Sequence, residues 1–494
     1  MILPKSTTLL IGFLVSVKTL GMCSEAVLAG AASNTITPDL AGRPVYLAGF
    51  GHDRIAKGVH DPLNVNCLAL RINGDDLVLC SVDLIGLFYD DVQEIRNSFQ
   101  KQAPPGSHLV VACTHTHEGP DTLGLWGATA AESGVDPKYL SWVEERIATT
   151  ALEAIHAMQP ARIQLARDDH PLLAQLQSVD RPPYVKDPFL FVMRLIGTSS
   201  GKTIATLVNW SDHPEILNRK NSEITADYPH WICQYLEEHE GGTALFFNGA
   251  IGKVSALGAQ VALLDPQTGR VAEDGTWRKA ELLGTMIGQL AERALEHAKI
   301  ISPDALVFRS SVIFIPLSND RFRAAEVAGI FLGRKPLFTD GRLDSSIGDL
   351  AVDASHSARY ALGHDLQSEV DYITLNVRDA PVAEIVTIPG EAFPEAVNGG
   401  IARYPGADYP NAPLETPIRM TLQTNFQFVL GLANDELGYL IPKAEWDEHP
   451  PWLQNNPQPY YGEINSVGPE AAGIVLRAVE NLVGKTRPDR NDER

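Results

Sequence analysis

Residues 109–120 read Leu-Val-Val-Ala-Cys-Thr-His-Thr-His-Glu-Gly-Pro. The first five residues are continuously apolar, a pattern typical of a strand whose two faces are both buried. Two histidines, His115 and His117, follow where this strand ends, and the ends of such strands commonly border a pocket. Because residues two apart on an extended chain point to the same side, both imidazoles can face that pocket. Histidine pairs also occur as ordinary surface or hydrogen-bonded residues.

Strand and helix patterns alternate on both sides of this stretch. Strands are predicted at 45–49, 64–72, 77–83, 161–165, 204–210, 244–247, 372–377, 384–388 and 426–432, and helices at 90–100, 138–158, 227–238, 278–300 and from about 469. This order predicts an α/β fold, with a mixed β-sheet core flanked by helices in a single large catalytic domain. Residues 317–365 lack clear periodicity and form either a lid or substrate-binding insertion or a plain surface excursion.

The N-terminus has the pattern of a signal peptide over residues 1–29. Lys5 precedes an apolar run at 9–15, and small residues lead to a cleavage signal at 27–29. We therefore expect an exported protein, secreted or periplasmic, whose domain spans 30–494. Met22 disfavours lipidation of Cys23, and no segment is long enough for a stable membrane span, although peripheral contact stays open.

Charge and cysteine content narrow the function further. The chain carries 61 acidic and 40 basic residues, a net charge of -21, which repels phosphate backbones and argues against nucleic-acid binding. Beyond the leader, Cys67, Cys80, Cys113 and Cys233 lie in apolar patterns and are expected to be buried rather than metal-bound. Cys67 and Cys80 flank an Asn-Gly turn signal, so a disulfide between them is compatible with the sequence.

Three further motifs carry residues with metal-binding chemistry. His213 follows the apolar run at 204–210, with Asp212 or Glu215 placed to orient its ring. Glu391 follows a strand and a Pro-Gly turn, and Tyr439 follows the strand at 426–432. Each alone has an ordinary interpretation: a structural histidine, an acid at a helix N-terminus, and a half-buried strand tyrosine.

Together the motifs resemble neutral/alkaline (non-lysosomal) ceramidases, and the resemblance extends over most of the chain beyond the leader. The family's motifs occur here in the same order, as Gly58-Val59-His60, Ser81-Val82-Asp83, Thr114 to Pro120, His213, Gly390-Glu391, Gly438-Tyr439, and Tyr461-Gly462 with Gly468-Pro469. The chain ends soon after the last motif, so the resemblance is to the catalytic domain only and to a divergent member.

The resemblance implies one zinc ion per chain, held by His115, His213, Glu391 and Tyr439. It also implies that His117 is the acid/base beside the metal. The serine proposed as catalytic in the family corresponds to Ser255, but Lys253 replaces its acidic neighbour, which weakens a serine-nucleophile mechanism. Glu118 and Asp121-Thr122 stand where the family usually has serine and a double glycine.

The expected reaction is zinc-dependent hydrolysis of the N-acyl amide bond of ceramide or a ceramide-like lipid by metal-activated water. His117 would protonate the leaving amine, and Tyr439 would steady the developing charge. Arg181 would stabilise the oxyanion or hold a substrate hydroxyl, unless it is only a solvated loop cation. The alternatives are a hydrolase of another N-acyl amine or small amide, and a non-catalytic exported protein that binds a metal or lipid.

Overall fold

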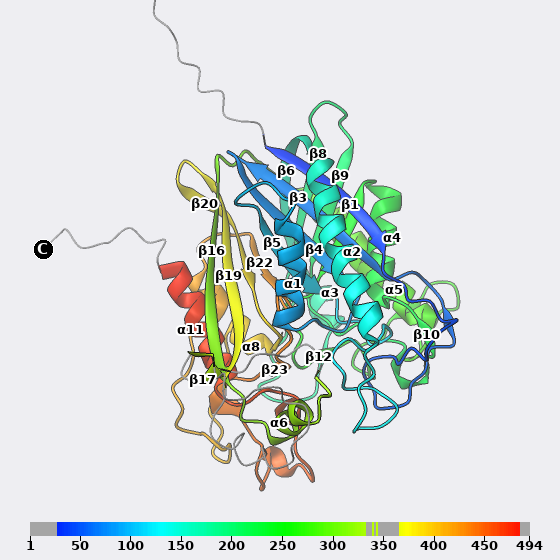
Figure 1. Cartoon of the computed structure of the whole chain (residues 1–494), viewed down its shortest axis with the longest axis vertical. Coiled ribbons are helices and arrows are strands. Elements are labelled where there is room, and N and C mark those ends of the chain that lie inside the picture. The colour runs from blue at the N-terminus through cyan, green and yellow to red at the C-terminus, as the bar shows by residue number, and fades with distance from the viewer. Residues whose placement is uncertain (1–26, 332–337, 340–341, 344–364, 485–494) are drawn as a thin grey trace, which may run out of the picture.

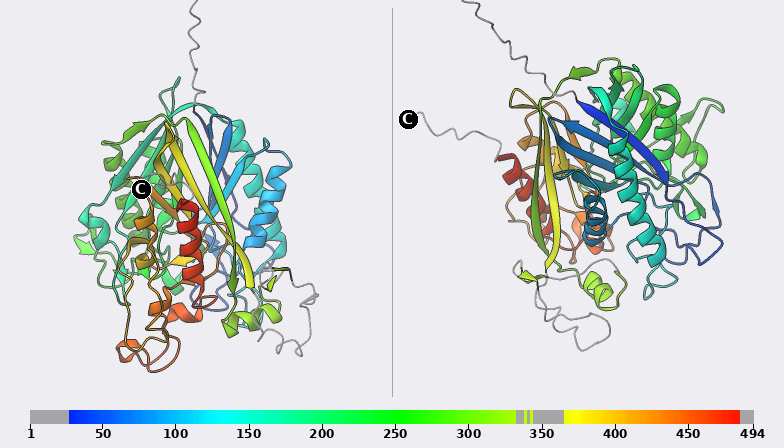
Figure 2. Two further views of the ribbon diagram at one scale, coloured as in Figure 1. Left: turned by 90° about the vertical axis from the view of Figure 1, so that its left-hand side faces the viewer. Right: turned by 45° about the horizontal axis from the view of Figure 1, so that its top comes forward.

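The computed structural model describes residues 27–331, 338–339, 342–343 and 365–484. The described residues form two packed β-sheets with helices on their outer faces, as Figures 1 and 2 show. The predicted α/β class, with a mixed sheet core in a single large domain, is confirmed. None of the described helices is long and apolar enough to cross a membrane.

The larger sheet is nine-stranded in the described part of the chain, in the order β11-β9-β8-β6-β1-β3-β4-β5 with β15 beside β6. Two neighbouring pairs, β4–β5 and β9–β11, are parallel and the others are antiparallel. Its strands are β1 Leu28–Thr35, β3 Asn64–Ile72, β4 Asp75–Val82, β5 His108–Cys113, β6 Gln159–Asp168, β8 Leu190–Gly197, β9 Thr203–Asn209, β11 Thr243–Phe247 and β15 Lys299–Ile301.

The second sheet has the order β18-β17-β19-β20-β22, with β16 beside β19. Its strands are β16 Ala305–Pro316, β17 Phe338–Thr339, β18 Arg342–Leu343, β19 Asp365–Val377, β20 Ala380–Thr387 and β22 Gln427–Leu430. Among the described residues, four short ladders lie outside the sheets: β2 Gly58–Val59 with β10 Glu223–Ile224, β7 Ser178–Val179 with β12 Val254–Ser255, β13 Leu264–Asp265 with β14 Arg270–Val271, and β21 Glu391–Ala392 with β23 Tyr439–Leu440.

Helices cover the outer faces of both sheets. These are mainly α1 Tyr89–Gln100, α2 Pro137–His156, α4 Tyr228–His239, α5 Trp277–Leu295 and α11 Ala471–Gly484. The other described helices are α3 Pro171–Gln175, α6 Asp320–Val327, α8 Pro394–Asn398, α9 Ile418–Thr421 and α10 Tyr461–Ile464. The start of α2 follows from sequence, because Asp136 caps the amide of Lys138 and Pro137 takes the first helical position. In Figure 1, α11 (red) and the pair α4 and α5 (green) lie on opposite sides of the molecule.

The hydrophobic core has separate parts that match these layers. Apolar residues of both sheets pack against each other in the middle, among them Leu79, Val110, Leu207, Ile373 and Phe428. On the outer faces, one cluster lies under α1 and α2, another under α4 and α5, and a third under α11. Strands buried on both faces explain why 109–113 has no polar alternation.

Two features bring distant strand ends together at one place. In its middle, the larger sheet is joined by a short contact: Leu28 and Ala29 of β1 pair with Pro160 and Gln159 of β6, and the amide of Ala161 donates to the carbonyl of Val27. At the other end its two halves meet, because Ser81 of β4 donates a hydrogen bond to the carbonyl of Phe246 in β11 at 2.5 Å. The loops that follow β5 and β9 therefore lie side by side, although these strands are far apart in the sheet order.

The second sheet reaches the same place through buried amides. The Asn209 side chain donates to the carbonyls of Phe247 and Val429 and accepts the amide of Val429, which ties β9 and β11 to β22. The amide of Cys113 donates to the carbonyl of Leu432 at 3.0 Å. These bonds satisfy strand-end backbone groups that would otherwise be buried without partners.

Three expectations about elements need correction. The first strand of the domain is β1, not residues 45–49, which form only isolated bridges. Small residues suit β1 because α2 crosses it closely: a Cβ on Gly30 would lie 2.2 Å from the carbonyl oxygen of Ala154. The helix predicted at 278–300 ends at Leu295, since Lys299–Ile301 pairs with β6. The predicted strand at 372–377 is the end of a longer strand that starts at Asp365.

Two other expectations fall partly outside the described residues. The signal-peptide prediction concerns mostly residues 1–26, and β1 begins at Leu28, within the predicted 1–29 leader. Within 317–365, residues 332–337, 340–341 and 344–364 are outside the described part, so the lid prediction stays a prediction. The disulfide between Cys67 and Cys80 is present and joins register partners of β3 and β4 across the predicted Asn73-Gly74 turn.

Candidate metal centre and active site

His115 is held in a conformation that few residues adopt. Its φ is +69°, in the left-handed region, and its amide donates to the carbonyl of Leu84 at 2.9 Å. Such a backbone persists only where the surroundings impose it, and it is often found at functional sites. The Nδ1 atom lies 2.6 Å from the carbonyl oxygen of Ile85, and because a carbonyl only accepts, Nδ1 must carry the proton. The Nε2 atom is therefore left as a ligand.

His213 has the same arrangement at the end of β9. Its Nδ1 donates to the carbonyl of Val254 at 2.7 Å, and its Nε2 lies 2.9 Å from Oε2 of Glu391. The prediction that Asp212 or Glu215 orients this ring is wrong, because the Val254 carbonyl does so. In histidines that bind metals, the ring nitrogen that does not contact the metal commonly donates to a backbone carbonyl, as Nδ1 does here.

Glu391 and Tyr439 come from the short ladder β21–β23, where they are register partners. Oε2 of Glu391 lies 3.5 Å from Nε2 of His115, so the carboxylate faces both imidazoles. Burial raises the pKa of the Tyr439 phenol, and the side chain lies close enough to this carboxylate for the charge of Glu391 to raise that pKa further. The structure thus brings together the four residues that the resemblance assigned to zinc. Glu391 is in a strand rather than at a helix N-terminus.

His117 completes a cluster of three imidazoles. Its ring centroid lies 5.1 Å from that of His115 and 5.8 Å from that of His213. One ring nitrogen from each of the three lies within 4.8 Å of the others. Both nitrogens of His117 are buried without a hydrogen-bond partner. The ring is therefore free either to move a proton or to serve as a third imidazole ligand.

The pKa values of His117 and His213 are shifted in opposite directions. Burial lowers the pKa of His117 well below its usual value, and the neighbouring His115 and His213 lower it further, so this ring is neutral near pH 7. Burial also lowers the pKa of His213, but the hydrogen bond and charge of Glu391 outweigh it and raise that pKa to about 9. Burial raises the pKa of Glu391, yet the charge of His115 and hydrogen bonds from both histidines bring it well below its usual range.

The residues fit a zinc ion. Two imidazoles with their outer protons engaged, a carboxylate and a phenol oxygen are donor types that zinc accepts in proteins. The carboxylate already faces both imidazoles in a buried place where an isolated charge would be costly. These residues would hold the ion, and the partnerless nitrogens of His117 would lie beside it.

Two cavities of different character meet at this cluster. A pocket of about 60 Å³ borders His115, His117 and Glu391, and its other walls are mainly apolar: Ile85, Phe88, Leu123, Trp126, Phe322 and Phe331. A hollow of about 560 Å³ shares Trp126, Phe322 and Tyr461 with this pocket and continues outward. Phe322 and Phe331 belong to the 317–365 segment, so its described part contributes to the pocket wall.

The second cavity, of about 610 Å³, is lined by His117, His213 and Tyr439 together with polar side chains such as Asp180, Arg181, Glu215 and Ser255. The centre therefore lies between an apolar pocket and a larger polar one. An amide with one apolar and one polar half is the kind of molecule that such a junction fits.

The fold is shared with ceramidases. A neutral ceramidase from Pseudomonas aeruginosa matches with a TM-score of 0.61 and 16% sequence identity, covering 93% of this chain and 74% of that one. A ceramidase complexed with C2 matches with a TM-score of 0.63 and 14% identity, covering 93% and 75%. No protein-family model matches the sequence, and no curated protein does. At these identities the similarity concerns the fold.

Ser255 and Arg181 line the polar cavity, but both are engaged. The Ser255 hydroxyl donates to the carboxylate of Glu215 at 2.7 Å. Arg181 is 4% exposed and binds Glu463 through both terminal nitrogens, at 2.6 and 2.7 Å. It is therefore not a solvated loop cation. Lys253, which stands in place of the family's acid, is paired with Glu395 at 2.5 Å.

Sequence reasoning did not assign a role to Gly49, Phe50 or Arg54. The ring of Phe50 packs edge-on against His117, with centroids 5.2 Å apart. A Cβ on Gly49 would lie 2.4 Å from Nδ1 of His117. The signal available in the sequence was Gly49-Phe50-Gly51 after an apolar run, where paired glycines indicate a close backbone approach.

Proposed function

We propose that this protein is a zinc-dependent amidohydrolase that cleaves the N-acyl amide bond of ceramide or a ceramide-like lipid to a fatty acid and an amine. The observation that carries the proposal is the convergence of His115, His213, Glu391 and Tyr439 around one point, with a partnerless imidazole beside it. One zinc ion per chain would be bound there. When bound, zinc supplies Lewis-acid activation of water and of the amide carbonyl.

His117 is the acid/base in this proposal. It is neutral, buried and free of hydrogen-bond partners, so it can take a proton from the attacking water and pass it to the leaving amine. The leaving amine needs that proton because an amide anion is too basic to depart. A third imidazole that has no hydrogen-bond partner favours a catalytic protein over a metal-storage protein, because storage does not require a group that moves protons.

Tyr439 contributes as a hydrogen-bond donor as well as a ligand. Burial, and then the charge of Glu391, raise the pKa of Tyr439 well above its usual value, so the group stays a phenol at neutral pH. Its hydroxyl lies at the junction of the two cavities, where the amide carbonyl would sit. A donor at that position can stabilise the negative charge that develops on the oxygen.

The two cavities suggest how the substrate lies. The acyl chain would enter the apolar pocket and continue outward past Trp126 and Phe322. The amine half would lie in the polar cavity beside Glu215 and Asp180. Arg181 would line this half, holding a substrate hydroxyl only through a donor not used by Glu463. Ser255 would contact substrate rather than attack it, since its hydroxyl is bound to Glu215.

A second candidate is a hydrolase of another N-acyl amine or a small amide. The charged lining of the larger cavity favours it, because a sphingoid base offers only an amine and hydroxyls to that many polar groups. The third candidate, from a different class, is a non-catalytic exported protein that uses the centre to bind a metal or lipid.

We further propose that the protein is exported. Mass-spectrometric determination of the N-terminus of the mature protein tests this proposal.

The deciding experiment is mass-spectrometric detection of products from a panel of ceramides and simpler N-acyl amines. The panel is incubated with zinc-loaded protein, chelated protein, and chelated protein given zinc back. Fatty acid from ceramide that disappears on chelation and returns with zinc would support the ceramidase proposal. Zinc-dependent cleavage of other amides only would select the second candidate. Bound zinc without cleavage of any substrate would favour the binding protein.

A further inference from the structure

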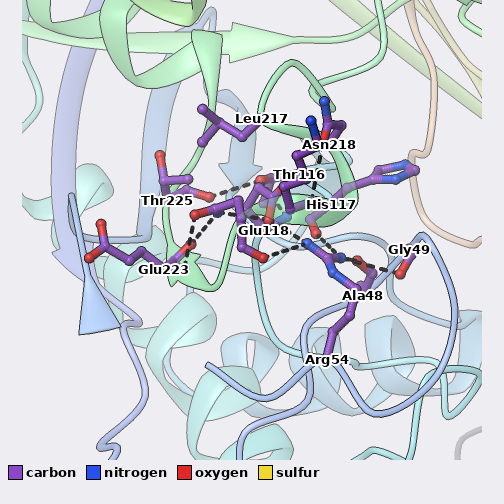
Figure 3. Close-up of polar contacts among 12 residues, drawn as sticks. Ala48, Gly49, Arg54, Thr116, His117, Glu118, Leu217, Asn218, Glu223 and Thr225 are labelled. Atoms are coloured by element: carbon purple, nitrogen blue, oxygen red, sulfur yellow. Dashed lines mark hydrogen bonds and ion pairs between the residues drawn. The ribbon is translucent and has the colours of Figure 1, made fainter. Parts of the chain in front are cut away.

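The loop that carries His117 is tied to the rest of the chain by the guanidinium of Arg54 (Figure 3). One terminal nitrogen, Nη1, donates to the carbonyls of Ala48, Gly49 and His117 at 2.7, 3.2 and 3.1 Å. The other, Nη2, binds the carboxylate of Glu118 at 2.7 Å. The Arg54 side chain is 10% exposed and that of Glu118 is fully buried, at 0%.

A third segment joins the same point. Asn221 donates from its side chain to the Glu118 carboxylate at 2.9 Å, and its carbonyl lies 3.4 Å from Nη2 of Arg54. The hydroxyl of Thr116 donates to the carbonyl of Thr225 at 2.9 Å. The segments 48–54, 116–118 and 221–225 are therefore fastened together around one buried ion pair (Figure 3).

This arrangement matters because the ring of His117 has no hydrogen bond of its own. Its position depends on its backbone and on the groups packed against it, which include Gly49 and the edge of the Phe50 ring as well as the rings of the other two histidines. Arg54 holds the backbone carbonyl of His117, the carbonyl of Gly49, and the face of the Phe50 ring at 5.1 Å. A single guanidinium thus contacts the His117 backbone and both of these neighbours, and the amide of His117 is held separately by the carbonyl of Pro214 at 3.1 Å.

We propose that Arg54 and Glu118 are positioning residues that fix the imidazole of His117 over the metal centre. The inference rests on the proposed function for the role of His117. Only a planar fork with several donors can contact four carbonyls and a carboxylate at once, so lysine cannot replace Arg54. The Glu118 carboxyl group accepts from Arg54 and Asn221 at once, which the shorter side chain of the serine usual in the resembling family could not do. Burial raises the pKa of Glu118 to about 8, against the lowering effect of the Arg54 charge and the Asn221 hydrogen bond, so its carboxylate depends on these two partners.

The test compares zinc content, kcat, KM and melting temperature of zinc-loaded Arg54→Met, Arg54→Lys, Glu118→Gln and the double variant Arg54→Met/Glu118→Gln. We expect one zinc per chain throughout and KM close to that of the original protein. We expect kcat to fall by about 100-fold, as for a catalytic group misplaced by about 1 Å. The double variant should lose no more kcat than Arg54→Met alone, because either change breaks the same Arg54–Glu118 contact.

Arg194→Met is the matched control. Arg194 pairs with Glu240, both side chains are 16% exposed, and neither residue lines either cavity at the centre. It should lower the melting temperature without a selective loss of kcat. The proposal is overturned if the Arg54 variants lose kcat only in proportion to stability, as the control does, if zinc is lost with turnover, or if the two single losses multiply in the double variant.

A second readout separates this proposal from the proposed function. In zinc-loaded protein, the imidazole nitrogens of His117 should give one sharp set of NMR signals. In Arg54→Met and Glu118→Gln that set should broaden or split, while the signals of His115 and His213 stay unchanged. Unchanged His117 signals in these variants would overturn the proposal that Arg54 and Glu118 position this ring. This measurement decides the matter even if no substrate is cleaved and the hydrolase proposal fails.

Discussion

The backbone of Glu391 pairs in parallel register with that of Tyr439 in a two-residue ladder. Register partners in neighbouring strands point their side chains to the same side, so the carboxylate and the phenol face the same imidazoles. The ladder is built from backbone hydrogen bonds. Either side chain can therefore be changed without removing the frame that holds the other.

Tyr439→Phe tests the phenol within that intact frame. We expect the variant to fold normally, to bind zinc about tenfold more weakly or worse, and to lose turnover even at saturating zinc, because a ligand and hydrogen-bond donor is gone. Zinc titration and kcat measure the two effects. Tyr461→Phe is the control, since its ring lies 5.8 Å from that of Tyr439 in the same cavity. Equal effects of the two changes would contradict the assignment of Tyr439.

Glu391→Ala and His115→Ala should each lose zinc and activity together. In the metal-free protein, removing Glu391 also strips the protonated His213 of its buried partner, which should cost about 3–5 kcal/mol in the free energy of unfolding. Urea unfolding with and without chelator measures this. Glu391→Gln keeps the shape and should cost less. Full zinc occupancy in either alanine variant would show that the metal lies elsewhere.

His117→Ala should keep zinc and lose about 10²–10⁴-fold of kcat, because the ring moves protons and does not hold the metal. Metal analysis and steady-state kinetics measure the two separately. Loss of zinc in this variant would mean that His117 is a third imidazole ligand, which the spacing within 4.8 Å also permits. The role assigned to it here would then be wrong.

Zinc binding should release protons in a pH-dependent way. The pKa of His213 is raised to about 9 in the metal-free state, so at pH 7 this ligand must lose a proton before it binds. We expect release of about one proton at pH 7, little at pH 10, and an apparent affinity that rises about tenfold per pH unit between them until pH 9. Calorimetry in buffers of different ionisation enthalpy measures this. Release that does not vary with pH would contradict the prediction.

Gly49→Ala should displace His117. The residue has φ +76°, and an added Cβ would lie 2.4 Å from Nδ1 of the imidazole. We expect turnover to fall while zinc stays bound, with a loss of stability of about 1–2 kcal/mol from the left-handed backbone. Gly51→Ala is the matched control, because Gly51 also has a positive φ, +110°, but has nothing within 4 Å of its Cβ. Comparable turnover in the two variants would show that contact with His117 is unimportant.

Much of the larger sheet follows from local sequence. The strand at 109–113 is continuously apolar because both of its faces are buried, and the turn at Asn73-Gly74 adopts the positive φ angles that these residues favour. Strand β1 was not predicted because its residues are small to allow close packing by α2, and this tertiary contact leaves no strand pattern in the local sequence. The same holds for β15, whose pairing with β6 overrides the helical pattern that runs into it.

The sequence by itself determined the types of residue at the centre and their places after strands, since strand ends and turn residues leave local patterns. It also indicated, through family resemblance, which histidines, glutamate and tyrosine belong together. Only the tertiary structure decided that Val254 orients His213, that Arg181 and Lys253 are paired with buried acids, and that Arg54 holds the His117 loop. These contacts join residues far apart in the chain, and whether a charge is paired or free depends on burial and partners that no local pattern encodes.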